Sequence, residues 1–257
     1  MNKNQLDNSL PGEIALELVP NSFEGLVADS TFAIQGFKPL CSINVPEMKS
    51  KAIKAHHAAD HLLRLGIDTI PHFRTIDRSY EDLEGLIAPL MALGLRSVLL
   101  ITGDPSKEVG FVASGLTPVN AIPRLKAKFP SLKIYAGLDP YRQSFRAELE
   151  YCKQKLEAGV DGFFTQPFFS PALLEVWLEQ LTGTEVWVGV SPVTTASFKA
   201  YWENMNKVVF PVDFALDLAS NCQNERRLFS IASKYGQKAY LMPVTVSTKE
   251  YLPALIP

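Results

Sequence analysis

Cysteine is scarce in this sequence, and neither sign of charge is in clear excess. The three cysteines, Cys41, Cys152 and Cys222, lie far apart among 257 residues, and none belongs to a Cys-x-x-Cys pair. An odd number of dispersed cysteines argues against a disulfide framework or a zinc site and fits free thiols in a reducing cytoplasm. The formal net charge of -2 provides no broad basic surface, so we expect no nucleic-acid partner.

Long apolar runs and glycine-rich nucleotide motifs are also missing. No stretch reaches eighteen consecutive apolar residues, and residues 1–13 are polar without the apolar core of an export signal. We therefore expect a cytoplasmic protein without a membrane segment. The first strand-like run leads into Pro20-Asn21-Ser22, with neither G-x-G-x-x-G nor G-x-x-x-x-G-K-[ST]. Any dinucleotide must then be held in another way.

The sequence does contain a regular alternation of strand-like and helix-like segments. Hydrophobic residues make up 47% of the chain, and eight short apolar runs are typical of strands in a buried parallel sheet. These runs cover residues 14–19, 40–45, 68–73, 97–101, 133–138, 162–165, 185–190 and 239–244. Helical patterns between them include residues 50–65, with Gly66 at a capping position, and a helix that begins at Thr117-Pro118.

This alternation predicts the fold class. Eight strand-helix units favour a (β/α)8 TIM barrel, a single α/β domain over residues 1–257, with residues 1–12 as a flexible N-terminal segment. An open doubly wound sheet alternates in the same way and stays as the alternative. Towards the end the pattern is less regular, with helices expected over residues 195–205 and 225–235 and a short tail after Val244.

Polar side chains or prolines follow most of the predicted strands. The βα loops of a barrel converge on one face, around the opening at the carboxyl ends of the strands, which we call the mouth. Glu17 and Asp104, from the first and fourth strands, should therefore both point towards the mouth. A carboxyl group that is partly desolvated near a second carboxylate has a raised pKa and can act as a general acid, while the other stabilises a cation. The simpler interpretation makes Glu17 a loop cap and Asp104 part of an Asp-Pro turn.

Four segments together resemble the methylenetetrahydrofolate reductase family. They are Ala-Leu-Glu-Leu-Val-Pro at 15–20, Pro-His-Phe-Arg-Thr at 71–75, Leu-Leu-Ile-Thr-Gly-Asp-Pro at 99–105, and Leu-Glu-Ala-Gly-Val-Asp-Gly-Phe-Phe-Thr-Gln-Pro-Phe-Phe at 156–169. The resemblance implies a (β/α)8 barrel that holds FAD. It also implies that FAD takes hydride from NAD(P)H and reduces 5,10-methylenetetrahydrofolate to 5-methyltetrahydrofolate, a step of one-carbon metabolism and methionine biosynthesis.

The resemblance implies a role for three of these residues. Glu17 resembles the general acid that protonates the bridging nitrogen of the folate, which suits a carboxyl group with apolar flanks. Asp104 resembles the aspartate placed beside the flavin and the pterin, where its charge stabilises a folate cation. Gln166 resembles the residue that recognises the pterin. Its amide suits this role because it offers a hydrogen-bond donor and an acceptor together.

Further residues fall where relatives line the FAD. Around the flavin ring these are Ser42 or Asn44, His72, Thr102, Gly103, Ala136 and Gly137. Glu148 and Lys155, seven residues apart on one helix face, match the family residues near the adenosine and phosphates, with solvated surface as the simpler interpretation of Lys155. The chain departs from the family at Thr102, Leu138 and Gln154, which leaves the adenosine side of the FAD site open.

Several alternatives remain at this point. A flavin-independent reductase would need Glu17, Asp104 and Gln166 but no phosphate residues. A reduced-folate-binding methyltransferase barrel, or a non-catalytic partner subunit, would need no general acid. The choice between NADH and NADPH is open, as is a homo-oligomer.

Two further patterns receive a structural interpretation. His57 and His61 have the spacing of a helical metal pair but lack the H-E-x-x-H glutamate and a third ligand, so we expect no metal. Four phenylalanines could contact a ligand, of which we expect at most one to touch the folate: Phe163, Phe164, Phe168 and Phe169. The segment 106–115 is either a loop that closes over a ligand or a mobile surface loop.

Overall fold

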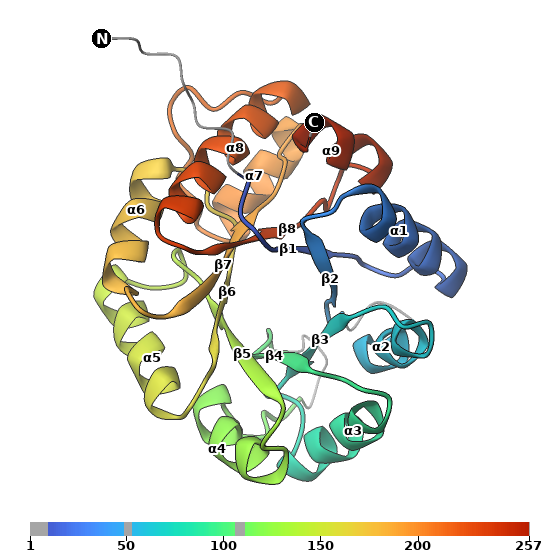
Figure 1. Cartoon of the computed structure of the whole chain (residues 1–257). Helices are drawn as coiled ribbons and strands as arrows, with labels where there is room; N and C mark the ends of the chain where they lie inside the picture. Colours follow the sequence, from blue (N-terminus) through green and yellow to red (C-terminus); the bar gives the residue numbers. More distant parts are fainter. Residues whose placement is uncertain (1–9, 49–52, 106–110, 257) are drawn as a thin grey trace.

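The computed structural model describes residues 10–48, 53–105 and 111–256. Within these residues, eight parallel strands follow one another around a closed barrel, and the last strand pairs with the first (Figure 1). The strands are β1 (Ile14–Glu17), β2 (Leu40–Val45), β3 (Thr69–Arg74), β4 (Ser97–Ile101), β5 (Lys133–Leu138), β6 (Gly162–Thr165), β7 (Glu185–Val190) and β8 (Lys238–Leu241). The predicted (β/α)8 barrel is confirmed, and the open sheet is excluded.

Helices surround the barrel on its outer side (Figure 1). They are α1 (Phe23–Gly36), α2 (Ala55–Arg64), α3 (Tyr80–Ala92), α4 (Pro118–Lys128), α5 (Phe145–Glu157), α6 (Pro171–Gln180), α7 (Ala196–Met205), α8 (Leu218–Lys234) and α9 (Thr248–Leu255). Most begin at a side chain that accepts a hydrogen bond from the first turn, such as Ser79, Thr117 and Asp217. In the described residues, no helix is both long and apolar enough to cross a membrane.

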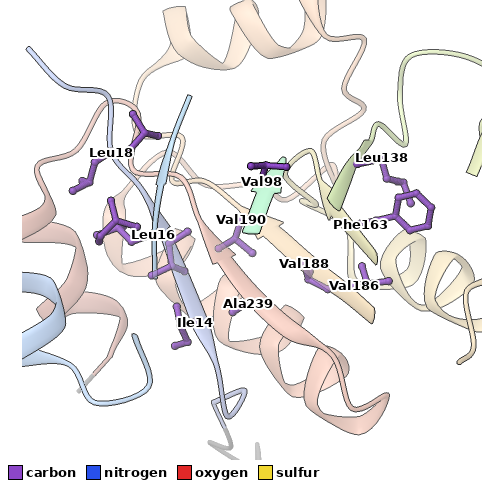
Figure 2. Close-up of a cluster of buried hydrophobic side chains, with 14 of the residues drawn as sticks. Ile14, Leu16, Leu18, Val98, Leu138, Phe163, Val186, Val188, Val190 and Ala239 are labelled. Carbon is purple, nitrogen blue, oxygen red and sulfur yellow. The ribbon is translucent and has the colours of Figure 1, made fainter. Parts of the chain in front are cut away.

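Side chains alternate between the two faces of each strand. Ile14, Leu16 and Leu18 of the first strand segment point outward and are buried in the core between the barrel and its helices (Figure 2). The same face of β7 contributes Val186, Val188 and Val190 to this core (Figure 2). The residues between them therefore point into the barrel, among them Ala15 and Glu17 on β1 and Trp187 on β7.

The barrel interior is filled by aromatic side chains towards the amino ends of the strands. The ring of Phe164 stacks on Trp187 with centroids 5.0 Å apart and meets the edge of Tyr240, also at 5.0 Å. Below this layer the Glu185 carboxylate accepts hydrogen bonds from the Tyr135 hydroxyl at 2.7 Å and from the Trp187 indole at 2.9 Å. Apolar and aromatic contacts therefore occupy this part of the interior, so the polar side chains at the carboxyl ends of the strands are the candidates for chemistry.

Some predicted element boundaries differ from the structure. The helix predicted over residues 50–65 begins at Ala55, while residues 49–52 lie outside the described ranges. The helix predicted from Glu225 begins at Leu218, where Asp217 caps it. Instead of a short tail after Val244, the chain forms α9, which packs against α1 and α8 (Figure 1).

The strand ends and the N-terminal segment also bear on the predictions. The first and last strands end earlier than predicted, at Glu17 and Leu241, although the N–H groups of Leu18 and Met242 still donate to the neighbouring strands. Most of the N-terminal segment that we expect to be flexible, residues 1–9, lies outside the described ranges. Of the remainder, Leu10 packs against the outer core.

Candidate active site

The carboxyl group of Glu17 lies inside the barrel at the end of β1. The hydroxyl of Tyr240, from β8, donates a hydrogen bond to it, and its Oε2 lies 4.0 Å from Nδ1 of His72. Burial raises the pKa of Glu17 to about 7, and the hydrogen bond from Tyr240 acts in the opposite direction. Of the two causes that we expect, desolvation and a second carboxylate, burial accounts for the rise and no carboxylate contributes. A carboxyl group with this pKa carries a proton near neutral pH and can donate it.

His72 and Asn44 form the wall beside Glu17. Their side chains approach within 3.3 Å, between Asn44 Nδ2 and His72 Nε2, and both are buried. Burial lowers the pKa of His72 to about 3, so the imidazole is neutral at physiological pH. Because the Asn44 amide donates to Nε2, the ring proton lies on Nδ1, the atom that faces Glu17. The acid therefore has a neutral polar neighbour and no cation.

Several buried polar atoms in this region have no hydrogen-bond partner within the described residues. They are Ser42 Oγ, Asn44 Oδ1, Arg74 Nε and Thr75 Oγ1. A buried polar atom without a partner costs free energy, and such atoms cluster where a ligand completes the hydrogen bonding. Ser42 and Asn44 are on β2, next to Glu17 on β1, so their unpartnered oxygens can accept hydrogen bonds from a polar ligand or, at Ser42, donate one to it. Arg74 Nε lies against the backbone of Gly103 instead.

Asp104 and Gln166 stand further out on the same face. Asp104 follows β4 by three residues and is exposed, and Gln166 directly follows β6 and is also exposed. The backbone N–H of Gln166 donates to the carbonyl of Leu138 at 2.8 Å, which continues the β5–β6 pairing and fixes where its side chain emerges. The structure thus places Glu17, Asp104 and Gln166 at the carboxyl ends of β1, β4 and β6, with Glu17 the deepest.

The residues predicted to line a flavin ring divide into two groups. Gly137 lies on the interior face of β5, and Thr102 and Gly103 form the loop after β4. Ala136 belongs instead to the outer core and is fully buried there, so its side chain faces away from the mouth. Since Tyr135 points inward, the two-residue alternation of a strand dictates this outward position for Ala136.

Glu148 and Lys155 lie on one face of α5, as their spacing predicts, but they form a buried network behind β5. The Lys155 ammonium donates to the carbonyl of Gly137 at 2.6 Å and lies 3.9 Å from Glu148. Glu148 also accepts hydrogen bonds from Arg142 at 2.8 Å and Gln143 at 2.7 Å. Lys155 is 2% exposed, and burial lowers its pKa to about 8. A phosphate could reach this ammonium only if the network opened.

The residues of this chain therefore suit the flavin ring of an FAD molecule but not its phosphates. The unpartnered Ser42 and Asn44 oxygens, with the small Gly103 and Gly137, suit a planar polar ring at the mouth. The buried Lys155 does not suit the phosphates. Of the cations nearby, Arg142 is 44% exposed on its side chain but already pairs with Glu148, while Arg146 and Lys153 are exposed on α5.

The remaining candidates have structural positions. The four phenylalanines of the β6 region are all buried: Phe163 and Phe168 lie in the outer core, Phe164 in the interior, and Phe169 in a separate cluster with Phe210 and Phe214. The ring of His61 lies 4.9 Å from Phe23, and no group of three metal-ligating side chains occurs among the described residues. Of the loop 106–115, residues 106–110 lie outside the described ranges.

Sequence reasoning missed two residues of this site, Tyr240 and Arg74. Tyr240 lies on the interior face of β8, and the alternation of β8 about Ala239 and Leu241 was a signal for its inward position. Arg74 is the fourth residue of the segment at 71–75 that carries part of the family resemblance, but the sequence indicates no role for it. A buried arginine at the end of a barrel strand is itself a signal, because such a charge needs partners.

Comparisons with solved structures agree with the fold. An uncharacterized protein from Clostridium thermocellum that binds two copies of 5-methyl-5,6,7,8-tetrahydrofolic acid has a TM-score of 0.68 and 14% identity, covering 99% of this chain and 96% of that chain. An oxaloacetate acetylhydrolase has a TM-score of 0.60 and 13% identity, covering 96% and 80%. At these identities the similarity shows the barrel fold alone.

Sequence comparisons are more specific. The 5,10-methylenetetrahydrofolate reductase of Pectobacterium carotovorum subsp. carotovorum is 25% identical over 153 residues, 58% of this chain and 51% of that protein. Methylenetetrahydrofolate reductase 2 of Saccharomyces cerevisiae is 26% identical over 161 residues, 54% of this chain and 26% of that protein. This chain thus spans about half and about a quarter of the lengths of these curated relatives.

A family model supplies the widest sequence match. The model, described as Methylenetetrahydrofolate reductase, matches residues 47–241, which include His72, Asp104, Gln166 and Tyr240. Glu17 precedes the matched range, and its place in the site comes from the barrel geometry. Because the match extends over well more than half of a chain with the corresponding barrel and polar mouth, the chain belongs to the methylenetetrahydrofolate reductase family.

Proposed function

We propose that this chain reduces 5,10-methylenetetrahydrofolate to 5-methyltetrahydrofolate with hydride that comes from NAD(P)H, in the cytoplasm. One observation carries the proposal: Glu17, a carboxyl group with a pKa of about 7, lies inside the mouth of a barrel of this family. Reduction of this substrate requires a proton for the bridging nitrogen and a hydride for the one-carbon unit. Glu17 is the group suited to supply that proton near neutral pH.

The proposed reaction starts with proton transfer from the Glu17 carboxyl to a ring nitrogen of the bound folate. The ring carbon–nitrogen bond then breaks, and the one-carbon unit becomes a cationic iminium. Hydride adds to its carbon and leaves a methyl group, so one proton and one hydride are consumed. Tyr240 keeps the Glu17 carboxyl oriented during the transfer, and the neutral His72 brings no competing positive charge beside the iminium.

Asp104 and Gln166 have binding roles in this proposal. The negative charge of Asp104 at the rim would stabilise the iminium, since opposite charges attract strongly where water is partly excluded. The Gln166 amide would donate to and accept from the pterin edge at once. Both are exposed at the carboxyl ends of their strands, where an entering ligand can reach them.

The proposal includes FAD as the carrier of the hydride. When bound, FAD would accept hydride from the nicotinamide and supply it to the folate. The unpartnered oxygens of Ser42 and Asn44 support its ring end. The buried Lys155 favours the second candidate, a flavin-independent reductase in which the nicotinamide donates directly to the folate.

The purified protein distinguishes these possibilities. A purified protein that is yellow, or that becomes yellow when FAD is added, supports FAD as the carrier of the hydride. A colourless protein that does not bind FAD but oxidises NAD(P)H in the presence of 5,10-methylenetetrahydrofolate supports direct transfer from the nicotinamide. A protein that binds 5-methyltetrahydrofolate but oxidises neither NADH nor NADPH in the presence of the substrate contradicts the proposed reduction and points to a non-redox folate barrel.

Substitution of Glu17 tests the acid. Glu17→Gln should abolish folate reduction and preserve binding of 5-methyltetrahydrofolate, because the amide is similar in size but has no proton to donate. If the protein binds flavin, reduction of that flavin by NAD(P)H should also survive. Glu24→Gln makes the same carboxyl-to-amide change at an exposed position on α1 and serves as the matched control. Loss of the flavin half-reaction instead of folate reduction would give Glu17 another role.

A further inference from the structure

The guanidinium of Arg74 is buried at the end of β3, beside the loop that carries Asp104. The residue is 7% exposed, and its Nη2 donates to the backbone carbonyl of Asp104 at 2.7 Å. The same nitrogen lies 3.4 Å from the carboxylate of Asp77. A buried cation is costly unless it is paired and hydrogen-bonded, and these two contacts meet that requirement in part. Arg74 thus joins the loop after β3 to the loop after β4.

The absence of a side chain at Gly103 leaves space for the guanidinium of Arg74. A Cβ atom at position 103 would lie 2.7 Å from Arg74 Nε, so the arginine side chain would have to move, and 3.1 Å from Arg74 Cζ, which is a tight contact. The φ angle of Gly103 is also positive, at 79°, a conformation that costs other residues free energy. The Arg74 side chain therefore lies against the bare backbone of the residue directly before Asp104.

Backbone hydrogen bonds hold the surrounding segment. The N–H of Thr75 donates to the Ile101 carbonyl at 2.9 Å, and the N–H of Ile76 donates to the Thr102 carbonyl at 3.0 Å. On the other side, the Ser114 hydroxyl donates to the Thr75 carbonyl at 2.7 Å. The residues after β3 are thus attached to both ends of the loop between β4 and α4. These backbone bonds stop at Thr102, and Arg74 extends the attachment to Asp104.

We propose that Arg74 is a positioning residue that sets the location of Asp104 at the barrel mouth. It acts on the backbone of Asp104, to which the carboxylate is attached, and does not itself touch the substrate. The planar guanidinium donates to the carbonyl and faces the Asp77 carboxylate at the same time, a geometry that lysine does not reproduce. The role given to Asp104 rests on the proposed function, but the attachment of its loop does not.

Hydrogen–deuterium exchange tests the attachment without any activity. In Arg74→Met, amides in a peptide covering residues 97–105 should exchange at least about ten times faster at the carboxyl end of β4, where the strand pairing opens more easily once the following loop is released. Arg78→Met is the matched control, since Arg78 lies in the same loop but pairs with Glu47 at 3.0 Å. It should leave this peptide unchanged. Equal exchange in Arg74→Met and the unmodified protein would overturn the proposal.

A double-mutant cycle tests the consequence for the reaction. Arg74→Met should lower kcat/KM for 5,10-methylenetetrahydrofolate about 10- to 100-fold, and adding it to Asp104→Asn should cause little further loss, because both changes remove one function. Arg78→Met should combine with Asp104→Asn multiplicatively. Multiplicative losses for Arg74→Met and Asp104→Asn would overturn the role of Arg74.

A conservative variant and the activity of the unmodified protein complete the design. Arg74→Lys retains a donor for the Asp104 carbonyl, so both its exchange rate and its kcat/KM should lie between those of Arg74→Met and the unmodified protein. It also decides the test if Arg74→Met does not fold; exchange and kcat/KM equal to those of the unmodified protein would then overturn the role of the guanidinium. If the unmodified protein does not reduce the folate at all, the proposed function fails, and the exchange comparison still decides whether Arg74 holds Asp104.

Discussion

The hydroxyl of Tyr240 donates a hydrogen bond to the carboxyl group of Glu17, although the two residues are 223 positions apart in the sequence. The bond crosses from the last strand of the barrel to the first. Burial and the charge of Glu17 raise the pKa of Tyr240 well above its usual value, so the phenol remains a donor throughout the physiological range. The bond also opposes the effect of burial on Glu17 and helps to keep its pKa at about 7.

Tyr240→Phe should raise the pKa of Glu17 further, because a bond that stabilises the ionised form is lost while burial remains. Activity that needs protonated Glu17 falls as the pH rises through this pKa. The alkaline limb of kcat/KM against pH should therefore move to higher pH in the variant. Tyr235→Phe, which alters a hydroxyl near Glu179 on the outside, is the control. A limb that stays in place or moves to lower pH would contradict the link between Tyr240 and the acid.

His72 should remain neutral between pH 5 and pH 8, since burial lowers its pKa to about 3. In NMR spectra of the folded protein, the imidazole resonances of His72, assigned by their loss in His72→Gln, should not shift over this range. In urea the same resonances should titrate near pH 6.5, the ordinary value for histidine. A titration step of His72 between pH 5 and pH 8 in the folded protein would show that this imidazole carries a charge beside Glu17.

Glu225→Gln should change how stability depends on pH. Glu225 is buried between α8 and α9, where it accepts a hydrogen bond from Tyr251 at 2.9 Å, and burial raises its pKa from 4.5 to about 8. The folded state therefore binds the proton more tightly than the unfolded state. The stability that this provides is complete below about pH 4.5 and is lost as the pH rises towards 8.

Urea denaturation at pH 5 and pH 8 measures this dependence. The unmodified protein should lose more free energy of unfolding between the two pH values than Glu225→Gln, with about 1.4 kcal/mol for each unit of pKa difference as the upper scale. Glu157→Gln, on the exposed end of α5, should behave like the unmodified protein. Parallel losses in Glu225→Gln and the unmodified protein would show that Glu225 does not titrate in this window.

Two glycines should respond oppositely to alanine. A Cβ atom at Gly189, on β7, would collide with the carbonyl oxygen of Thr165 and lie 2.7 Å from Met242 Cε. Gly189→Ala should therefore destabilise the barrel by about 1–3 kcal/mol. Gly85, on the exposed side of α3, has open space around it, so Gly85→Ala should stabilise by about 0.5–1 kcal/mol. Chemical denaturation of both variants gives the comparison, and a stabilising Gly189→Ala would contradict the packing described for β7.

The sequence was sufficient to predict most of the barrel because its signals are local. Buried parallel strands appear as short apolar runs, and the cap at Thr117 marks the start of α4 as predicted. The start of α8 was missed because its first turns contain polar residues, among them Asn221 and Asn224, and lack a clear apolar stripe. Asp217, which caps this helix, was the available signal.

The site was less predictable, because its contacts depend on closure of the barrel and on strand faces. The polar position of Glu17 within an apolar run was visible, but its bond to Tyr240 depends on how β8 meets β1. The outward position of Ala136 follows from strand alternation and could have been deduced. The burial of Lys155 could not, since it results from the way α5 packs on the strand that carries Gly137.

Among the described residues, the aromatic layer of Tyr135, Phe164, Trp187 and Tyr240 occupies the barrel interior behind Glu17. Under the proposed function, the donor and the acceptor of hydride therefore share the space in front of Glu17, at the carboxyl ends of the strands. They can bind there one after the other, or they can bind at the same time with their reacting rings against each other. If they bind one after the other, each reactant at high concentration should inhibit binding of the other.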